Sequence, residues 1–294
     1  NHEDTYIMIS NQLDVPTWWE KQYPEEMVVT SSGADAGGVS FASDKMVEDA
    51  TAANLAMLEH MMQQPYANRI IGSTLISCRT SEWLWYGTGQ YATDMSEVSQ
   101  KKFREWLAET YQTDEALQKA WNNSTVTLET AMVPTFEERK SETYETFVDP
   151  ETQRNTIDYL TFMQDLVADR LIDFAAAITE AVDDRWVIGA YYGYINNVYY
   201  YTASTTLHLG VEKVLDDPNI DYFAAPTLYG ERYDGEAAGH MAMIESIRAH
   251  GKTFMEENDT RTCTYHDYNT NFYTRDAVGP TYTVSDSLSQ LQRD

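Results

Sequence analysis

Short apolar segments alternate with amphipathic helical segments along this chain of 294 residues, and no other feature restricts its fold as much. Five segments have the length and apolar content of buried strands, namely residues 6–10, 70–76, 186–192, 220–225 and 252–257. A helical segment or a long loop follows each one, and the two-residue turns of antiparallel hairpins are scarce. The pattern therefore predicts an α/β fold in which right-handed crossovers join parallel strands.

The helical segments carry apolar residues three and four positions apart. Ser43 is a typical N-cap for a helix whose apolar face runs from Met46 to Met61, and Pro65 ends that helix. Further helices are expected around 103–107, 156–182, 211–215 and 240–250. Residues 123–155 show little periodicity, so we expect them to cross the surface without regular structure.

Composition argues against several classes of function. Acidic residues number 47 against 20 basic ones, and the net charge of -27 would repel nucleic acid. The chain has two cysteines, Cys78 and Cys263, which could form one disulfide bond or remain as two free thiols, and we favour free thiols. The chain has no apolar run long enough to span a membrane, and its acidity suits an extracellular or periplasmic setting. Because metal-ligand spacing and phosphate-binding glycine loops are lacking, we expect neither a metal nor a cofactor.

Five strands are too few to close a (β/α)8 barrel. We interpret residues 1–294 as one catalytic barrel domain that is a fragment of a longer polypeptide. An open doubly wound sheet fits the strand count equally well. In both architectures the functional side chains gather at the C-terminal ends of the parallel strands.

Two glutamates occupy such strand ends. Glu82 follows the strand at 70–76, and Trp83 beside it could form an apolar wall that raises a carboxyl pKa, as a proton donor requires. Glu257 ends the strand at 252–257. Glu256 competes with it, because neighbouring residues of a strand point to opposite faces, and we prefer Glu257. Glycoside hydrolysis uses two carboxyl groups of this kind, one on each side of the scissile bond.

Aromatic residues give a second signal, because aromatic faces stack on the C–H faces of sugar rings. The chain has 21 Tyr, 7 Trp and 9 Phe, although ordinary packing remains the alternative for any one of them. The candidate substrate-binding residues, including polar neighbours of Glu257, are Trp19, Trp83, Tyr194, Tyr229, Asn258 and Arg261.

Several motifs occur in order along most of the chain. They are Pro16-Thr17-Trp18-Trp19, Ser40-Phe41-Ala42-Ser43, Ile70-Ile71-Gly72 before Glu82-Trp83, Phe103-Arg104-Glu105-Trp106-Leu107, Asp217-Pro218-Asn219-Ile220-Asp221-Tyr222, and Gly251-Lys252 before Glu257-Asn258-Asp259. Together they resemble glycoside hydrolase family 42, the β-galactosidase-like glycosidases. Barrels of that clan carry the acid/base after strand four and the nucleophile after strand seven.

The resemblance implies that barrel strands three to seven are present, with Glu82 as acid/base and Glu257 as nucleophile of a retaining enzyme acting on β-glycosides. It implies an oligo- or polysaccharide as substrate and is compatible with a homo-oligomer. One position departs from the clan pattern, because Ser81 stands where clan members usually place an Asn that binds the sugar 2-hydroxyl. A catalytically inactive carbohydrate-binding protein on the same barrel is therefore the alternative, and an acidic structural subunit is a third reading.

Overall fold

A five-stranded parallel sheet forms the centre of the computed structural model, which describes residues 5–30, 35–78, 81–84, 93–139, 147–196, 207–228 and 239–258. Its strands are β1 (Ile7–Gln12), β4 (Ile70–Ile76), β5 (Val187–Tyr191), β6 (Tyr222–Pro226) and β7 (Thr253–Glu257). Each predicted strand is present, and its bounds lie within two residues of the expected ones. The α/β prediction with parallel strands is confirmed.

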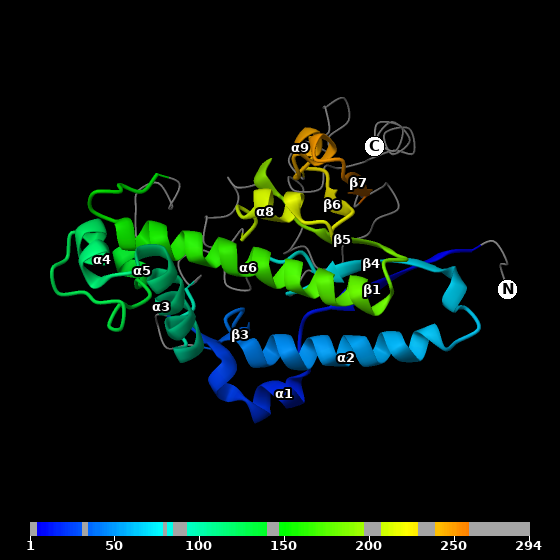
Figure 1. Cartoon of the computed structure of the whole chain (residues 1–294), viewed down its shortest axis with the longest axis horizontal. Helices are drawn as coiled ribbons and strands as arrows, with labels where there is room; N and C mark the ends of the chain where they lie inside the picture. Colours follow the sequence, from blue (N-terminus) through cyan, green and yellow to red (C-terminus); the bar gives the residue numbers. More distant parts are fainter. Residues whose placement is uncertain are drawn as a thin grey trace, which may run out of the picture.

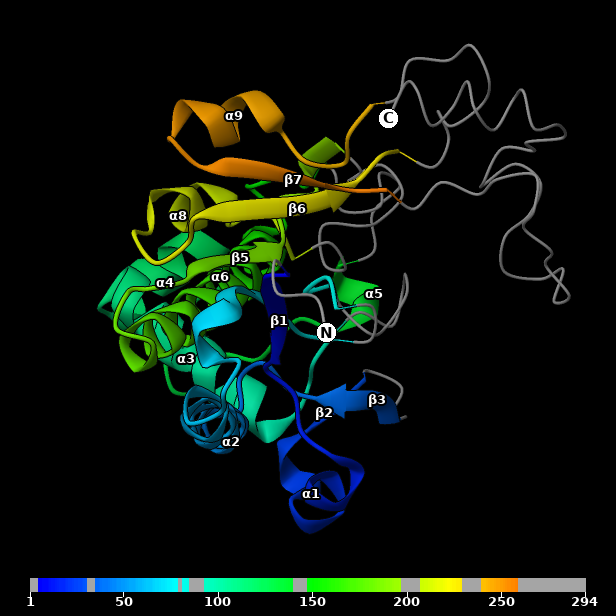
Figure 2. The ribbon, with the colours of Figure 1, turned by 90° about the vertical axis from the view of Figure 1, so that its right-hand side faces the viewer.

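The order of the strands in the sheet follows their order along the chain: β1-β4-β5-β6-β7. A doubly wound sheet reverses its strand order at a switch point, whereas a barrel adds each strand beside the previous one. The described sheet therefore has the topology of consecutive strands of a barrel. Figure 2 shows β5, β6 and β7 lying side by side.

The helices connect the strands, and the two longest, α2 and α6, run side by side along the sheet (Figure 1). Their bounds are α1 (Thr17–Gln22), α2 (Asp44–Met62), α3 (Glu97–Tyr111), α4 (Asp114–Trp121), α5 (Phe136–Arg139), α6 (Arg154–Ala181), α8 (Val211–Asp216) and α9 (Ile244–Ala249), with short 3-10 turns η1 (Pro24–Glu26) and η2 (Ala67–Arg69). The hydroxyl of Ser43 accepts a hydrogen bond from the backbone N–H of Met46 at 2.9 Å, which confirms the predicted N-cap of α2. None of the helices in the described residues has the length and apolarity needed to cross a membrane.

Several elements were not predicted, among them α5, which lies within residues 123–155, where we expected no regular structure. A small antiparallel sheet of β2 (Met27–Val29) and β3 (Asp35–Val39) lies beyond the β1 side of the main sheet (Figure 2). Helices α1 and α4 occupy stretches that showed too few apolar residues in register for a helix to be expected. Strand β3 has the sequence Asp-Ala-Gly-Gly-Val, which lacks apolar alternation, so its pairing with β2 decides its conformation.

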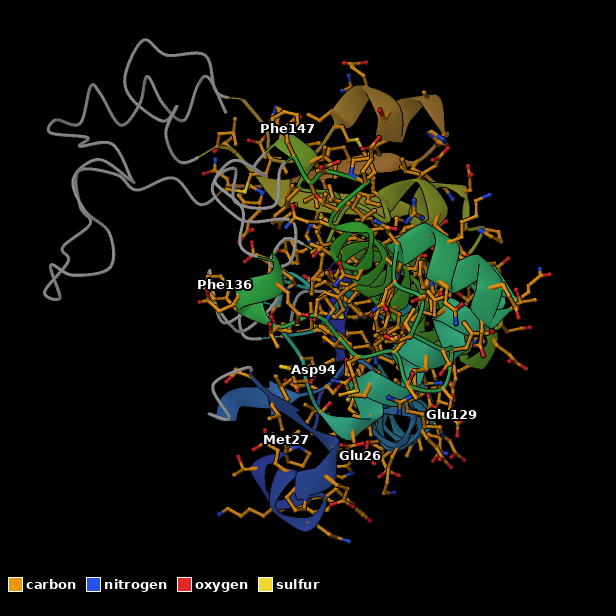
Figure 3. The ribbon with its side chains drawn as sticks, turned by 90° about the vertical axis from the view of Figure 1, so that its left-hand side faces the viewer. Glu26, Met27, Asp94, Glu129, Phe136 and Phe147 are labelled. Carbon is orange, nitrogen blue, oxygen red and sulfur yellow. The ribbon has the colours of Figure 1, made fainter. Side chains whose placement is uncertain are left out.

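A buried carboxyl joins this small sheet to the helices. Asp94 lies at their junction in Figure 3 and accepts a hydrogen bond from the hydroxyl of Ser40. Its backbone N–H donates to the hydroxyl of Tyr159 on α6 at 3.1 Å, and the next residue, Met95, donates to the carbonyl of Val29 at 2.7 Å. Burial raises the pKa of Asp94, which favours its protonated form.

The two faces of the main sheet differ. Ile188, Ala190 and Phe223 lie on the face that packs against the helices and are at most 1% exposed. On the opposite face, Met8 and Val187 are 40% and 47% exposed in the described structure. The strand register assigns every second residue to this open face, which is the side of a barrel strand that faces the lumen.

Gly189 on the open face allows an unusually close approach between strands. A Cβ at this position would lie 2.4 Å from the Cγ of Tyr222, so only glycine leaves room for the Tyr222 ring to cross β5. The hydroxyl of Tyr222 reaches β4, where it lies 2.7 Å from the hydroxyl of Thr74. This contact ties β4, β5 and β6 together beneath their carboxyl ends.

Candidate active site

The loops that leave β4, β5 and β7 bring the predicted site residues to one edge of the sheet. Because all five strands are parallel, their carboxyl ends lie at the same edge. Glu82 follows β4. Tyr191 is the last residue of β5, and Tyr194 lies in the loop after it. Glu257 is the last residue of β7. Residues more than a hundred positions apart in the sequence therefore meet there.

Glu82 lies in a strained turn. Cys78, Ser81 and Trp83 have positive φ angles of 66°, 69° and 57°, a conformation that L-residues adopt at a cost of roughly 1–3 kcal/mol each. The backbone N–H of Trp83 donates to the carbonyl of Ser77 at 3.2 Å, and the Trp83 indole Nε1 donates to the carbonyl of Leu75 at 3.0 Å. These bonds offset the strain and fix the backbone of Glu82 beside the end of β4.

The Trp83 ring forms part of the core beneath Glu82. It is 0% exposed and stacks on Phe41, with ring centroids 6.4 Å apart. Burial of so large a ring stabilises the turn by several kcal/mol, on the order of 25 cal/mol per Å² of apolar area. Trp83 therefore holds the turn instead of offering its face to a sugar.

Tyr194 contacts the carboxyl group of Glu82 directly. Its hydroxyl donates a hydrogen bond to Oε1 of Glu82 at 3.1 Å, and the Tyr194 side chain is 1% exposed. A buried phenol beside a carboxylate resists ionisation, because its anion would lose solvation and be repelled. Burial first, and then the charges of Glu82 and Glu257, raise the pKa of Tyr194 well above its ordinary value.

His208 joins the backbones of the two loops. Its Nδ1 accepts a hydrogen bond from the backbone N–H of Tyr194 at 3.1 Å, and its Nε2 lies 2.8 Å from the carbonyl oxygen of Glu82. An N–H only donates and a carbonyl only accepts, so the geometry requires the neutral tautomer with its proton on Nε2. Burial lowers the pKa of His208 to about 3, in agreement with a neutral ring.

Both glutamates act electrostatically on the same two tyrosines. Burial raises the pKa of Tyr191, and the charges of Glu257 and Glu82 raise it further. The same two charges raise the pKa of Tyr194. Because such an effect weakens with distance, the carboxyl groups of Glu82 and Glu257 lie on a common side of the molecule, around the end of β5.

The register of β7 distinguishes Glu257 from Glu256. Glu257 pairs with Pro226 of β6 and lies on the same face as Met255 and Thr253, which pair with Ala224 and Tyr222. This is the open face that also carries Tyr191. Glu256 pairs with Ala225 and lies on the face of Phe223, toward the helices. The alternation predicted from the sequence therefore directs Glu257 to the side of Tyr191.

Three predicted sugar contacts have a different environment. Trp19 is 2% exposed, and its indole Nε1 donates to Asp49 of α2 at 2.7 Å. Trp83 and Tyr194 are buried as described above. Side chains so enclosed offer no open ring face for a sugar to stack on in this structure, and the expectation that these three residues contact substrate stays a prediction. Their sequence positions beside strand ends place Trp83 and Tyr194 next to Glu82, but these positions could not reveal their burial.

Of the other predicted substrate-binding residues, the structure describes Asn258 alone. Asn258 is exposed and follows Glu257 directly at the carboxyl end of β7. Tyr229, Arg261 and Cys263 lie outside the described residues, so their predictions stay predictions. The thiol of Cys78 is buried, 3.8 Å from the hydroxyl of Ser77.

Two residues of the site were not singled out from the sequence as members of it. Tyr191, the last residue of β5, lies on the open face, and alternation along the predicted strand could have identified it. His208 is fully buried between the two loops. Nothing in the sequence around His208 indicates its contact with Glu82, which lies 126 residues earlier in the chain. Within the described part of the chain, no group of three or more His, Cys, Asp or Glu side chains could hold a metal ion.

Parallel strands in barrel order, with carboxylates above their carboxyl ends, define a protein of the (β/α)8-barrel class. Comparison with known proteins extends this assignment to a family. The profile of glycoside hydrolase family 42, described as beta-galactosidase, matches residues 3–272. The chain therefore belongs to this family of glycoside hydrolases, and the resemblance inferred from its motifs is confirmed.

Solved structures support the barrel fold. The beta-galactosidase of the Antarctic haloarchaeon Halorubrum lacusprofundi has a TM-score of 0.56 at 19% identity, with 83% of this chain and 33% of that chain covered. For the beta-galactosidase of the psychrophilic Marinomonas ef1 the TM-score is 0.53 at 19% identity, with 76% and 31% covered. The catalytic domain of a beta-amylase from Paenibacillus polymyxa gives 0.59 at 16% identity, with 84% and 65% covered.

At these identities the likeness shows the fold alone, and the chain spans about a third of the length of both beta-galactosidases. The described sheet thus corresponds to part of a barrel, as the resemblance to family 42 implied. A search of curated proteins finds no match.

Proposed function

We propose that this chain carries the two catalytic carboxyl groups of a retaining β-glycosidase, with Glu82 as acid/base and Glu257 as nucleophile. The observation that supports the pair is that the charges of both glutamates raise the pKa of Tyr191 and of Tyr194. Two carboxyl groups sharing one sugar-sized site are the minimum that this reaction needs. Membership of family 42 favours a β-galactoside as the substrate.

The proposed reaction has two steps. Glu82, in its acid form, gives a proton to the glycosidic oxygen while the Glu257 carboxylate attacks the anomeric carbon from the other face and forms a glycosyl ester. The Glu82 carboxylate then takes a proton from water, and the water oxygen attacks the anomeric carbon and releases Glu257. Retention requires the two carboxyl groups to stand roughly 5 Å apart across the bond.

A mechanism-based inhibitor tests the nucleophile. The protein is incubated with a 2-deoxy-2-fluoro-β-galactoside carrying an activated leaving group, and the labelled peptide is identified by mass spectrometry. We expect one adduct, on Glu257. Glu257→Gln should abolish labelling, whereas Glu256→Gln, a matched change one residue away on the opposite face of β7, should leave it intact. Labelling of Glu256, or of neither residue in an active preparation, would contradict the assignment.

A catalytically inactive carbohydrate-binding protein is the second candidate. Its support is Ser81, which precedes Glu82 where the clan usually has Asn and is half-buried with a left-handed backbone. A binding protein would be stabilised by galactosides in a thermal-shift assay, without turnover of any aryl galactoside. A Ser81→Asn variant distinguishes the two readings, because only an enzyme with intact Glu82 and Glu257 can gain activity from a restored 2-hydroxyl contact.

A further inference from the structure

Glu82 is held by two residues of the β5–α8 segment, and neither belongs to the carboxylate pair. Tyr194 hydrogen-bonds the carboxyl group, and His208 hydrogen-bonds the backbone carbonyl of the same residue. His208 also accepts the backbone N–H of Tyr194, which closes a ring of three contacts around Glu82. We propose that Tyr194 and His208 are positioning residues, which fix one carboxyl oxygen of Glu82 as an acceptor and direct its proton to the other oxygen.

The first step of this inference concerns the direction of the Tyr194 bond. The Tyr194 side chain is 1% exposed and its hydroxyl lies 3.1 Å from the Glu82 carboxyl group, and burial together with the nearby carboxylates raises the pKa of this phenol well above its ordinary value. The phenol therefore keeps its proton at neutral pH and donates it to Oε1 of Glu82. Because Oε1 already accepts the hydrogen bond from Tyr194, it is the less favourable oxygen for protonation. The transferable proton of the Glu82 carboxyl group therefore resides on Oε2.

The second step concerns the backbone. Glu82 lies beyond the end of β4, so its carbonyl oxygen is outside the hydrogen-bond ladder of the sheet and needs another donor. Nε2–H of His208 supplies that donor at 2.8 Å. The imidazole is itself enclosed by two tyrosine rings, with centroids 4.3 Å away for Tyr192 and 4.8 Å away for Tyr194. It cannot rotate without breaking both of its hydrogen bonds.

The inference rests on the proposed role of Glu82, so its test needs a readout that does not require turnover. Among the described residues, the titratable groups that face Glu82 and Tyr194 include Tyr191, His208 and Glu257. The protein is labelled with glutamate carrying 13C at the carboxyl carbon, and the Glu82 signal is identified by its loss in Glu82→Gln. Its pH titration is then compared between wild type and variants.

Tyr194→Phe removes only the donor to the Glu82 carboxylate. Losing a hydrogen bond to a charged group should raise the pKa of Glu82 by about one to two units. The basic limb of the kcat/KM profile, where the acid/base loses its proton, should move to higher pH by the same amount. The kcat of Tyr194→Phe should fall more for glycosides with poor leaving groups than for activated aryl glycosides, because departure of a poor leaving group depends on the proton that Glu82 donates.

Tyr192→Phe is the matched control. Tyr192 is also fully buried and also loses one hydrogen bond, from its hydroxyl to the carbonyl of Leu207 at 3.0 Å. Its ring remains against His208, and Asp165 and Asp169 are the acidic residues that act on it. A merely structural effect of losing a buried hydroxyl would appear in both variants, whereas a shift of the Glu82 titration should appear in Tyr194→Phe alone.

The results separate this inference from the proposed function. An unchanged Glu82 titration in Tyr194→Phe, or an equal shift in Tyr192→Phe, overturns the positioning role whether or not the protein is active. A shifted titration in a protein without glycosidase activity supports the positioning role and removes the proposed function. If Tyr194→Phe fails to fold, 3-fluorotyrosine at position 194 replaces it, because a more acidic phenol donates more strongly and should lower the Glu82 pKa. No shift with that residue overturns the inference.

Discussion

His208 should make the stability of this protein sensitive to mild acid. Its ring is fully buried and holds a pKa of about 3, against 6.5 for an exposed histidine. Because the folded pKa is below the unfolded one, the unfolded state binds the proton more readily. The contribution of the neutral ring is therefore complete above about pH 6.5 and is lost as the pH falls from there toward 3.

The size of the loss follows from the difference between the two pKa values. Each pH unit below 6.5 removes about 1.4 kcal/mol until the folded-state pKa is reached. Between about pH 7.5 and about pH 5, His208 alone should therefore lower the free energy of unfolding by about 2 kcal/mol. Asp94 acts in the opposite direction, because burial raises its pKa and acid then favours the folded state.

A comparison with His208→Gln isolates the effect. The His208→Gln protein should be less stable than wild type at neutral pH, because the hydrogen bonds to Tyr194 and Glu82 are lost or lengthened. Its glutamine side chain, unlike histidine, does not bind a proton in this pH range. Urea denaturation followed by tryptophan fluorescence gives the free energy of unfolding for both proteins across this pH range. The gap between them should narrow by about 2 kcal/mol toward about pH 5. Asp94 is common to both and cancels, so parallel pH curves would refute the buried neutral imidazole.

Three further predictions concern the site and its support. Glu82→Ala should lower kcat far more for alkyl glycosides than for activated aryl glycosides in steady-state assays, and equal losses would remove Glu82 from the acid/base role. Asp158→Ala should cost about 3 kcal/mol in urea denaturation, because the buried carboxyl accepts from Tyr111 at 2.6 Å, Trp121 at 2.7 Å and Arg154 at 2.8 Å. Gly189→Ala should lower the free energy of unfolding by about 1–3 kcal/mol, because the added methyl group would collide with the Tyr222 ring of β6. An unchanged melting temperature would contradict the close packing of β5 on β6.

The strands could be predicted because each one is an apolar run buried by its neighbours, whatever its partners are. Ile70–Ile76 was found with the correct bounds for this reason. Strand β3 was missed because its Asp-Ala-Gly-Gly-Val sequence has no apolar pattern, and only its pairing with Met27–Val29 makes it a strand. Helix α1, likewise, begins after Pro16 and is too short to show a repeat.

The positions of Glu82 and Glu257 at one edge of the sheet could be predicted from topology, because parallel strands end at one edge and alternation separates Glu257 from Glu256. The surroundings of the pair could not. Trp19 was expected to contact substrate, but its side chain is 2% exposed and its indole donates a hydrogen bond to Asp49, 30 residues later. Burial is decided by residues far away in the sequence, and neither hydrophobicity nor position beside a strand end distinguishes a packed aromatic ring from one that faces a ligand.

The two glutamates are supported unequally by the described residues. Glu82 lies between residues with left-handed backbone angles, a conformation that the chain can maintain only because Trp83 is buried beneath it and His208 satisfies its carbonyl. Glu257 owes its orientation to the regular register of β7, the last strand in the order of the described sheet. A proton donor must present one particular oxygen, whereas a nucleophile held by a strand needs only the correct face. A strained turn held by buried neighbours is therefore expected at an acid/base, and this is what the chain has at Glu82, the residue proposed for that role.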